Sequence, residues 1–148
     1  MFSLVFPGQG SQTIGMGKDF FESYDLVKDL FKQADDSLGA TLSKIILEGP
    51  KDELDLTVNT QPAIFLISYS IFQVMKREFN MDLDNAKYFA GHSLGEYSAL
   101  CAAKYLSFSD TIKILKTRGN AMQNAVPKGE GGMLSLIHIS EPTRRSMI

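Results

Sequence analysis

A serine lies between two glycines in the stretch Gly91-His92-Ser93-Leu94-Gly95, which fits the pattern Gly-x-Ser-x-Gly. Residues 87–90 before it predict a strand, and residues 96–103 after it predict a helix. Glycines at these positions allow a sharp turn that exposes the serine hydroxyl, and the start of the helix favours negative charge, so the Leu94 N–H can donate to an oxyanion. The pattern therefore predicts that Ser93 is a nucleophile; the alternative is a serine that only caps a helix.

A second glycine-rich loop, residues 7–17, follows a predicted strand at residues 3–6. The loop fits neither common phosphate-binding pattern: the dinucleotide pattern needs glycine in place of Thr13, and the P-loop needs lysine in place of Met16. If the loop lies beside the serine turn, the Gln9 N–H can be a second oxyanion donor. Otherwise the loop is an ordinary connection between a strand and a helix.

Two other side chains near Ser93 are candidates for the chemistry. Cys101 is the single cysteine and lies among apolar residues of a predicted helix, which is typical of a buried, inert thiol. His92 adjoins Ser93, and neighbouring side chains on a sharp turn diverge. We therefore expect His92 to order the turn or line the pocket rather than act as the base for Ser93. With two histidines and one cysteine, no metal-ligand cluster has usable spacing.

The composition of the 148-residue chain is that of a globular protein with one domain. Its formal net charge is −2 and its Lys and Arg residues are scattered, which argues against a nucleic-acid groove or a polybasic membrane patch. Polar residues interrupt the apolar run at residues 63–74 before it reaches transmembrane length, and the N-terminus lacks a signal-peptide pattern. We therefore expect a soluble, cytoplasmic protein.

Strands and helices alternate along the chain, which favours an α/β fold with a parallel sheet. Apolar residues at three- and four-residue steps predict one amphipathic helix that Gly39 ends, and Thr60-Gln61-Pro62 has the pattern of a helix N-terminus. The predicted elements are strands at residues 3–6 and 87–90 and helices at residues 20–38, 41–47, 60–79, 96–103 and 109–124.

Four motifs together resemble the malonyl-CoA:acyl carrier protein transacylases. They are FPGQGSQ, TQPA, GHSLGEYSAL and RGNAMQ, which begin at Phe6, Thr60, Gly91 and Arg118 and follow the family's order and spacing over about residues 1–133. The resemblance implies an α/β-hydrolase-like parallel sheet core with a nucleophile elbow. It also implies an enzyme of fatty acid biosynthesis, an acyltransferase that moves a malonyl group from coenzyme A to the phosphopantetheine thiol of acyl carrier protein, with no bound cofactor.

The resemblance also implies roles for individual residues. A planar guanidinium suits the bidentate binding of a carboxylate, which is the role of the matched arginine toward the free end of the malonyl group. The matched residues are the nucleophile Ser93, the oxyanion-hole N–H groups of Gln9 and Leu94, the carboxylate partner Arg118, and the substrate-pocket residue Gln61; His92 joins the substrate-binding residues through its place on the turn.

The chain departs from the family pattern after residue 133. The family's catalytic histidine lies far downstream of the serine, and nothing in the family-like region matches it. Residues 135–144 resemble a translated sequencing adapter, so we expect residues 1–134 to be the N-terminal part of an acyltransferase domain and residues 135–148, with His138, to be a non-native tail. The domain then lacks its later strands and small inserted subdomain, and we expect the fragment to be inactive.

One smaller departure concerns Lys104, because the family usually has glycine after this helix. If the backbone there is left-handed, lysine costs on the order of 1 kcal/mol.

Two other interpretations stay open. A serine hydrolase of the lipase or esterase type would use the same serine turn, with water in place of the thiol acceptor. Arg118 discriminates against it, because a site for a charged acyl group gives a lipase no advantage. A carrier-protein-binding module without chemistry is the other interpretation, and covalent malonylation of Ser93 would exclude it.

Overall fold

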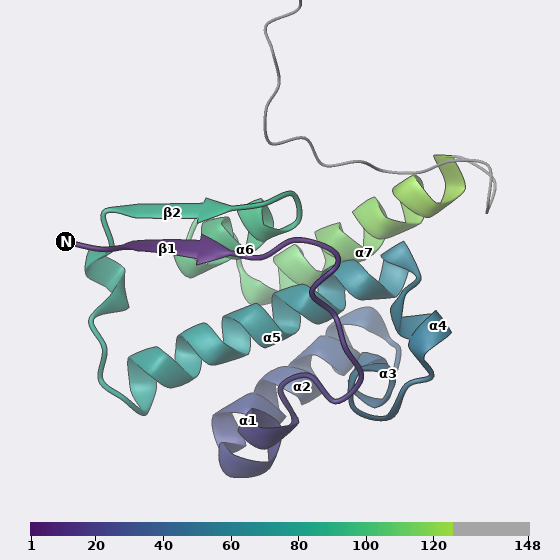
Figure 1. Cartoon of the computed structure of the whole chain (residues 1–148), viewed down its shortest axis with the longest axis horizontal. Helices are drawn as coiled ribbons and strands as arrows, with labels where there is room; N and C mark the ends of the chain where they lie inside the picture. The colour runs from purple at the N-terminus through teal and green to yellow at the C-terminus, as the bar shows by residue number, and fades with distance from the viewer. Residues whose placement is uncertain (126–148) are drawn as a thin grey trace, which may run out of the picture.

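A two-stranded parallel sheet and the helices around it make up the part of the chain that the computed structural model describes, residues 1–125 (Figure 1). Strand β1 (Ser3–Phe6) pairs with β2 (Tyr88–Gly91), with Leu4 opposite Phe89 and Phe6 opposite Gly91. Parallel strands need a long crossover, and here it contains five α-helices. The α/β class with parallel strands is confirmed.

Seven α-helices and one short 3-10 helix accompany the strands in residues 1–125. None of these described helices combines the length and the apolar character needed to cross a membrane. The helices are α1 (Lys18–Ser23), α2 (Asp25–Leu38), α3 (Leu42–Glu48), α4 (Lys51–Leu54), α5 (Thr57–Arg77), η1 (Leu83–Asn85), α6 (Gly95–Ala102) and α7 (Phe108–Ala125).

The prediction of one helix over residues 20–38 is wrong, because the chain breaks between α1 and α2 at Tyr24. The φ and ψ angles of Tyr24 are −127° and 118°, which belong to extended backbone. The apolar spacing continues across the break, so periodicity does not reveal it. The predicted end of the helix is confirmed: Gly39 follows α2 in the left-handed conformation, with φ 59°.

Helix α5 begins at Thr57, three residues before the predicted start, so Pro62 lies beyond its first turn. Thr60 is not the cap of this helix; it is fully buried, and its Oγ1 donates to the Leu54 carbonyl at 2.5 Å. The TQPA stretch therefore lies inside α5, where it faces the core and the neighbouring α7. Helix α4, one turn long, was not predicted.

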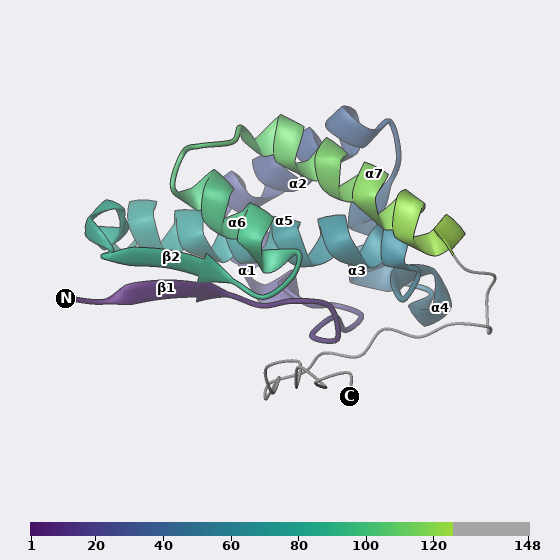
Figure 2. The same cartoon turned by 90° about the horizontal axis from the view of Figure 1, so that it is seen from above.

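The main core lies among the helices, and the largest helix contact of the described chain joins α5 and α7. Helix α6 packs against both strands (Figure 2). Beneath the strands, a second, smaller cluster of buried apolar side chains connects the sheet to α5 and α6. Its members are Phe6, Phe72, Leu83, Ala99 and Ala102.

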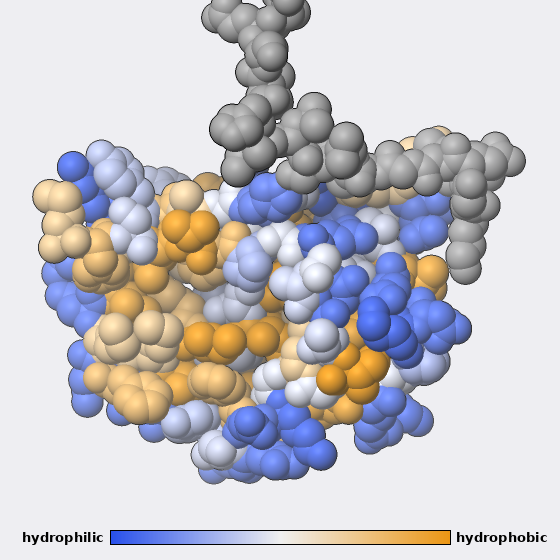
Figure 3. Space-filling view, in the orientation of Figure 1, coloured by the Kyte–Doolittle hydropathy of each residue, from blue (hydrophilic) through white to orange (hydrophobic). Residues whose placement is uncertain are grey.

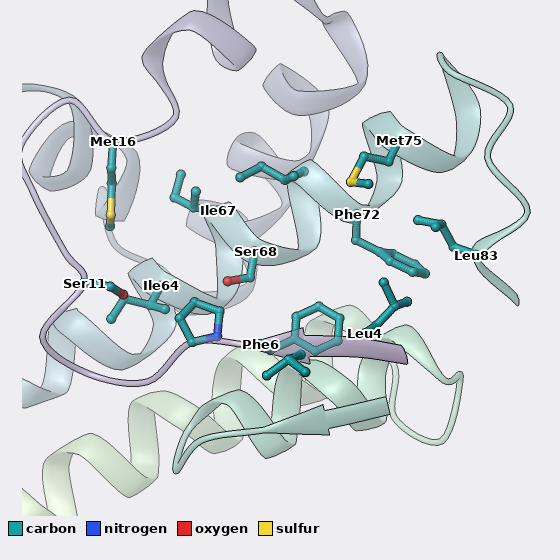
Figure 4. Close-up of a pocket in the computed structure, with 13 residues that line it drawn as sticks. Leu4, Phe6, Ser11, Met16, Ile64, Ile67, Ser68, Phe72, Met75 and Leu83 are labelled. Atoms are coloured by element: carbon teal, nitrogen blue, oxygen red, sulfur yellow. The ribbon is translucent and has the colours of Figure 1, made fainter. Parts of the chain in front are cut away.

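An open apolar groove runs between β1 and α5, with a volume of about 340 Å³. Leu4 and Phe6 of β1 and Ile67 and Phe72 of α5 converge on it (Figure 4), and the space-filling view shows hydrophobic surface in this region (Figure 3). Val5 of the same strand also lines the groove and is 76% exposed. The described residues therefore leave β1 with an uncovered apolar flank.

The backbone at Lys104, just after α6, is left-handed with φ 68°, so the condition for a strained lysine is met. Because this conformation crowds a β-carbon, we expect Lys104→Gly to raise the free energy of unfolding by about 1 kcal/mol relative to Lys104→Ala. Both variants lose the exposed ion pair between Lys104 Nζ and Asp84 Oδ2 (2.8 Å). The difference between their free energies of unfolding therefore isolates the cost of the left-handed backbone. Urea denaturation of the full-length protein measures it, and equal stability of the two variants would contradict it.

Candidate active site

Ser93 lies on a tight turn between β2 and α6, with a positive φ of 56°. The two flanking glycines make the turn possible, because a Cβ on Gly91 would overlap the backbone of Gly95. A Cβ on Gly95 would in turn lie 2.8 Å from the carbonyl oxygen of Pro7. Helix α6 therefore passes directly against the ends of the strands, in the arrangement of a nucleophile elbow. A non-glycine residue with positive φ is rare, and such strain is common at functional sites.

Arg118, from α7, brings a positive charge to the serine. Its Nη2 donates to Ser93 Oγ at 3.2 Å, and its Nη1 donates to Gln61 Oε1 at 2.7 Å. The guanidinium carbon also lies 5.8 Å from the centre of the Tyr97 ring, within range of a cation–π contact. The structure thus brings Ser93, Gln61 and Arg118 together from three different helices or turns.

The crossing of α5 and α7 explains how Arg118 reaches Gln61. A Cβ on Gly119 would lie 2.7 Å from both the Thr57 carbonyl oxygen and the Val58 Cα, so at this point the two helices approach without an intervening side chain. Gln61 is fully buried at this contact. Its Nε2 donates to the thioether sulfur of Met122, one turn beyond Arg118, at 3.1 Å.

Two backbone N–H groups are available beside the serine. Leu94 is the N-cap residue of α6, and neither its N–H nor that of Gln9 donates a hydrogen bond within residues 1–125. The loop that carries Gln9 lies against the serine turn, because a Cβ on Gly8 would be 2.8 Å from the His92 carbonyl oxygen. The assignment of Gln9 and Leu94 to an oxyanion hole stays a prediction that this placement permits.

His92 takes part in the turn through its backbone. Its N–H donates to the Phe6 carbonyl at 3.1 Å, and its carbonyl accepts from the Gly95 N–H at 2.9 Å, which ties the turn to β1 and α6. His92 is the one histidine in the described part of the chain, since His138 lies outside the described residues. Its proposed contribution to the substrate pocket stays a prediction.

Cys101 is 3% exposed, and burial raises the pKa of its thiol. Burial disfavours the thiolate, which is the reactive form of cysteine. Its position inside α6 therefore argues against a role as an alternative nucleophile. Residues 1–125 also contain no group of three or more His, Cys, Asp or Glu side chains placed to hold a metal ion.

Sequence reasoning missed several residues that build the site, namely Tyr97, Gly119, Met122 and Gln123. Gln123 Oε1 accepts from the Thr57 N–H at 3.2 Å, at the first residue of α5. The available signal was the RGNAMQ motif, which contains three of these residues. Their partners, however, lie about sixty residues earlier in the sequence.

The comparisons with known proteins agree with this geometry. Residues 3–147 match the model of a family described as the acyl transferase domain. The chain belongs to this family. A malonyl CoA-acyl carrier protein transacylase of Haemophilus influenzae is 48% identical over 136 residues, which cover 92% of this chain and 43% of the relative. The Escherichia coli K12 transacylase is 41% identical over 140 residues, which cover 95% and 44%.

Solved structures also resemble this acyl transferase domain. The acyl-carrier-protein S-malonyltransferase of Bartonella henselae superposes with a TM-score of 0.80 at 48% identity and covers 86% of this chain and 41% of its own. A malonyl-transacylase solved in complex with a type II polyketide acyl carrier protein gives a TM-score of 0.78 at 41% identity. The chain thus spans less than half the length of the relatives that it matches.

Proposed function

We propose that the full-length protein is an [acyl-carrier-protein] S-malonyltransferase of fatty acid biosynthesis. It would move a malonyl group from coenzyme A to the phosphopantetheine thiol of acyl carrier protein through an ester on Ser93. The observation that carries this proposal is the Arg118 guanidinium 3.2 Å from Ser93 Oγ, in a domain of the acyl transferase family. A positive charge at the nucleophile suits an acyl group that ends in a carboxylate.

In the first step, Ser93 Oγ attacks the thioester carbonyl of malonyl-CoA. The new Oγ–C bond forms, the C–S bond breaks, and the proton that leaves the serine goes through a general base to the departing thiolate. The N–H groups of Gln9 and Leu94 would donate to the oxyanion. In the second step, the carrier thiol attacks the serine ester: a C–S bond to the carrier forms, the Oγ–C bond breaks, and the thiol proton passes through the base to Oγ. By the family resemblance, we propose that the general base is a histidine far downstream of Ser93, beyond the family-like region of this chain.

Arg118 would bind the free carboxylate in both steps. Gln61 and Tyr97 hold one edge and one face of the guanidinium, which leaves the Nη2 side toward Ser93 for the substrate. In the structure this side donates to Ser93 Oγ. An arriving carboxylate would take over this donor and free the serine oxygen for attack.

The complex of a related malonyl-transacylase with an acyl carrier protein supports a carrier protein as the acyl acceptor. Serine ester chemistry of this kind uses the side chains and N–H groups already named, and we propose no resident metal or cofactor. We place the reaction in the cytoplasm, with no membrane or nucleic-acid partner.

A transfer assay with the full-length protein tests the proposal. The protein is incubated with malonyl-CoA and either the phosphopantetheinylated carrier or the carrier without that group, and the products are separated by mass. We expect malonyl-carrier to form only with the phosphopantetheinylated carrier. Release of free malonate without a loaded carrier would indicate a hydrolase. If neither product forms, the interpretation as a carrier-protein-binding module without chemistry is favoured.

A further inference from the structure

The side-chain amide of Gln61 lies between two groups that together determine its orientation. Arg118 Nη1 lies 2.7 Å from Oε1, and Met122 Sδ lies 3.1 Å from Nε2. A guanidinium carries only donors, so it must face the amide oxygen. The amide nitrogen then faces the thioether, which can act as a weak acceptor.

Burial increases the importance of the sulfur contact. Gln61 is fully buried, and among the described residues Met122 Sδ is the acceptor that hydrogen-bonds to its Nε2. A buried donor without a partner is costly. If the sulfur were absent, the amide would gain by turning over or by moving toward another acceptor. Either change withdraws Oε1 from Arg118.

Helix α7 presents both partners of this amide at once. Arg118 and Met122 are four residues apart, so their side chains extend from the same face of the helix. Gly119 allows the backbone of α7 to approach that of α5, which brings this face within hydrogen-bond distance of Gln61. A small displacement of the amide therefore acts directly on the guanidinium.

We propose that Met122 is a positioning residue for Arg118. Its sulfur accepts a hydrogen bond from the Gln61 amide, and the fixed amide holds the guanidinium at Ser93. The kinetic consequence rests on the proposed function: an oriented guanidinium favours an acyl group with a carboxylate over an uncharged one. Met122 then contributes to the choice of acyl group through Gln61 and Arg118.

Three variants of the full-length protein test this role. Met122→Leu preserves the side-chain volume but removes the acceptor, Met122→Gln supplies an oxygen acceptor instead, and Met75→Leu makes the same leucine change in the groove between β1 and α5. We expect Met122→Leu to lower the ratio of kcat/KM for malonyl-CoA over acetyl-CoA about fivefold, the factor that one neutral hydrogen bond contributes. Met122→Gln should recover part of the ratio, and Met75→Leu should not change it.

The outcomes separate this inference from the proposed function. An unchanged ratio in Met122→Leu, or the same change in Met75→Leu, would overturn the positioning role. If the unmodified protein transfers no malonyl group, the proposed function fails, and a crystal structure of Met122→Leu decides the inference. A displaced Gln61 amide and guanidinium would support it, whereas both side chains in their original positions would overturn it.

Discussion

Replacing Arg118 with alanine is expected to remove most malonyl transfer by the full-length protein while sparing the transfer of uncharged acyl groups. The carboxylate of the substrate would lose its charged partner, which costs about 2 to 5 kcal/mol for a buried pair. Arg118 is only half-buried, so we expect the lower part of this range, about 30- to 150-fold in kcat/KM for malonyl-CoA. Steady-state kinetics with malonyl-CoA and acetyl-CoA measure both effects.

Two further variants serve as controls for this result. Arg118→Lys keeps the charge but loses the planar fork, so we expect an intermediate loss for malonyl-CoA. Lys113→Ala removes an exposed positive charge from the same helix, and we expect little change for either substrate. An equal loss of malonyl and acetyl transfer in Arg118→Ala would mean that Arg118 only supports the contact of α5 with α7.

The largest effect is expected from Ser93→Ala. Removing the nucleophile of other serine enzymes lowers kcat by about 10⁶-fold, and we expect a loss of about 10⁴-fold or more in malonyl transfer. Alanine occupies the same backbone conformation as serine at similar cost, so the fold should persist. Circular dichroism and thermal melting of the variant would verify that it is folded.

Cys101→Ala is the matched control for the rival nucleophile. Because Cys101 is buried and the pKa of its thiol is raised, we expect this variant to retain transfer activity. Loss of activity in Cys101→Ala together with residual activity in Ser93→Ala would reverse the assignment of the nucleophile.

The serine turn could be predicted from the sequence because its causes are local. Two glycines, a strand before them and a helix after them determine the backbone conformation of Ser93 within a few residues. The end of α2 at left-handed Gly39 is local in the same way and was also expected. Tyr24 shows the limit of this reasoning, since the helix breaks there although the apolar spacing continues.

The contacts of Arg118 could not be derived from spacing. Gln61 and Arg118 are 57 residues apart, and their meeting depends on how closely α5 and α7 cross. The resemblance to a family named both residues, but the thioether of Met122 and the close approach at Gly119 are properties of the packed helices. Tertiary packing, rather than local propensity, therefore determines the contacts of Arg118 in the site.

Locating the acyl group by mass spectrometry after brief incubation of the full-length protein with malonyl-CoA tests the central claim most directly. Ser93 and Cys101 lie between the same two tryptic sites, Lys87 and Lys104, so cleavage after Glu96 with a glutamate-specific protease is needed to separate them. We expect the malonyl mass on the fragment that contains Ser93 and its absence in Ser93→Ala. A malonyl group on the fragment that contains Cys101, or an adduct that persists in Ser93→Ala, would contradict the account.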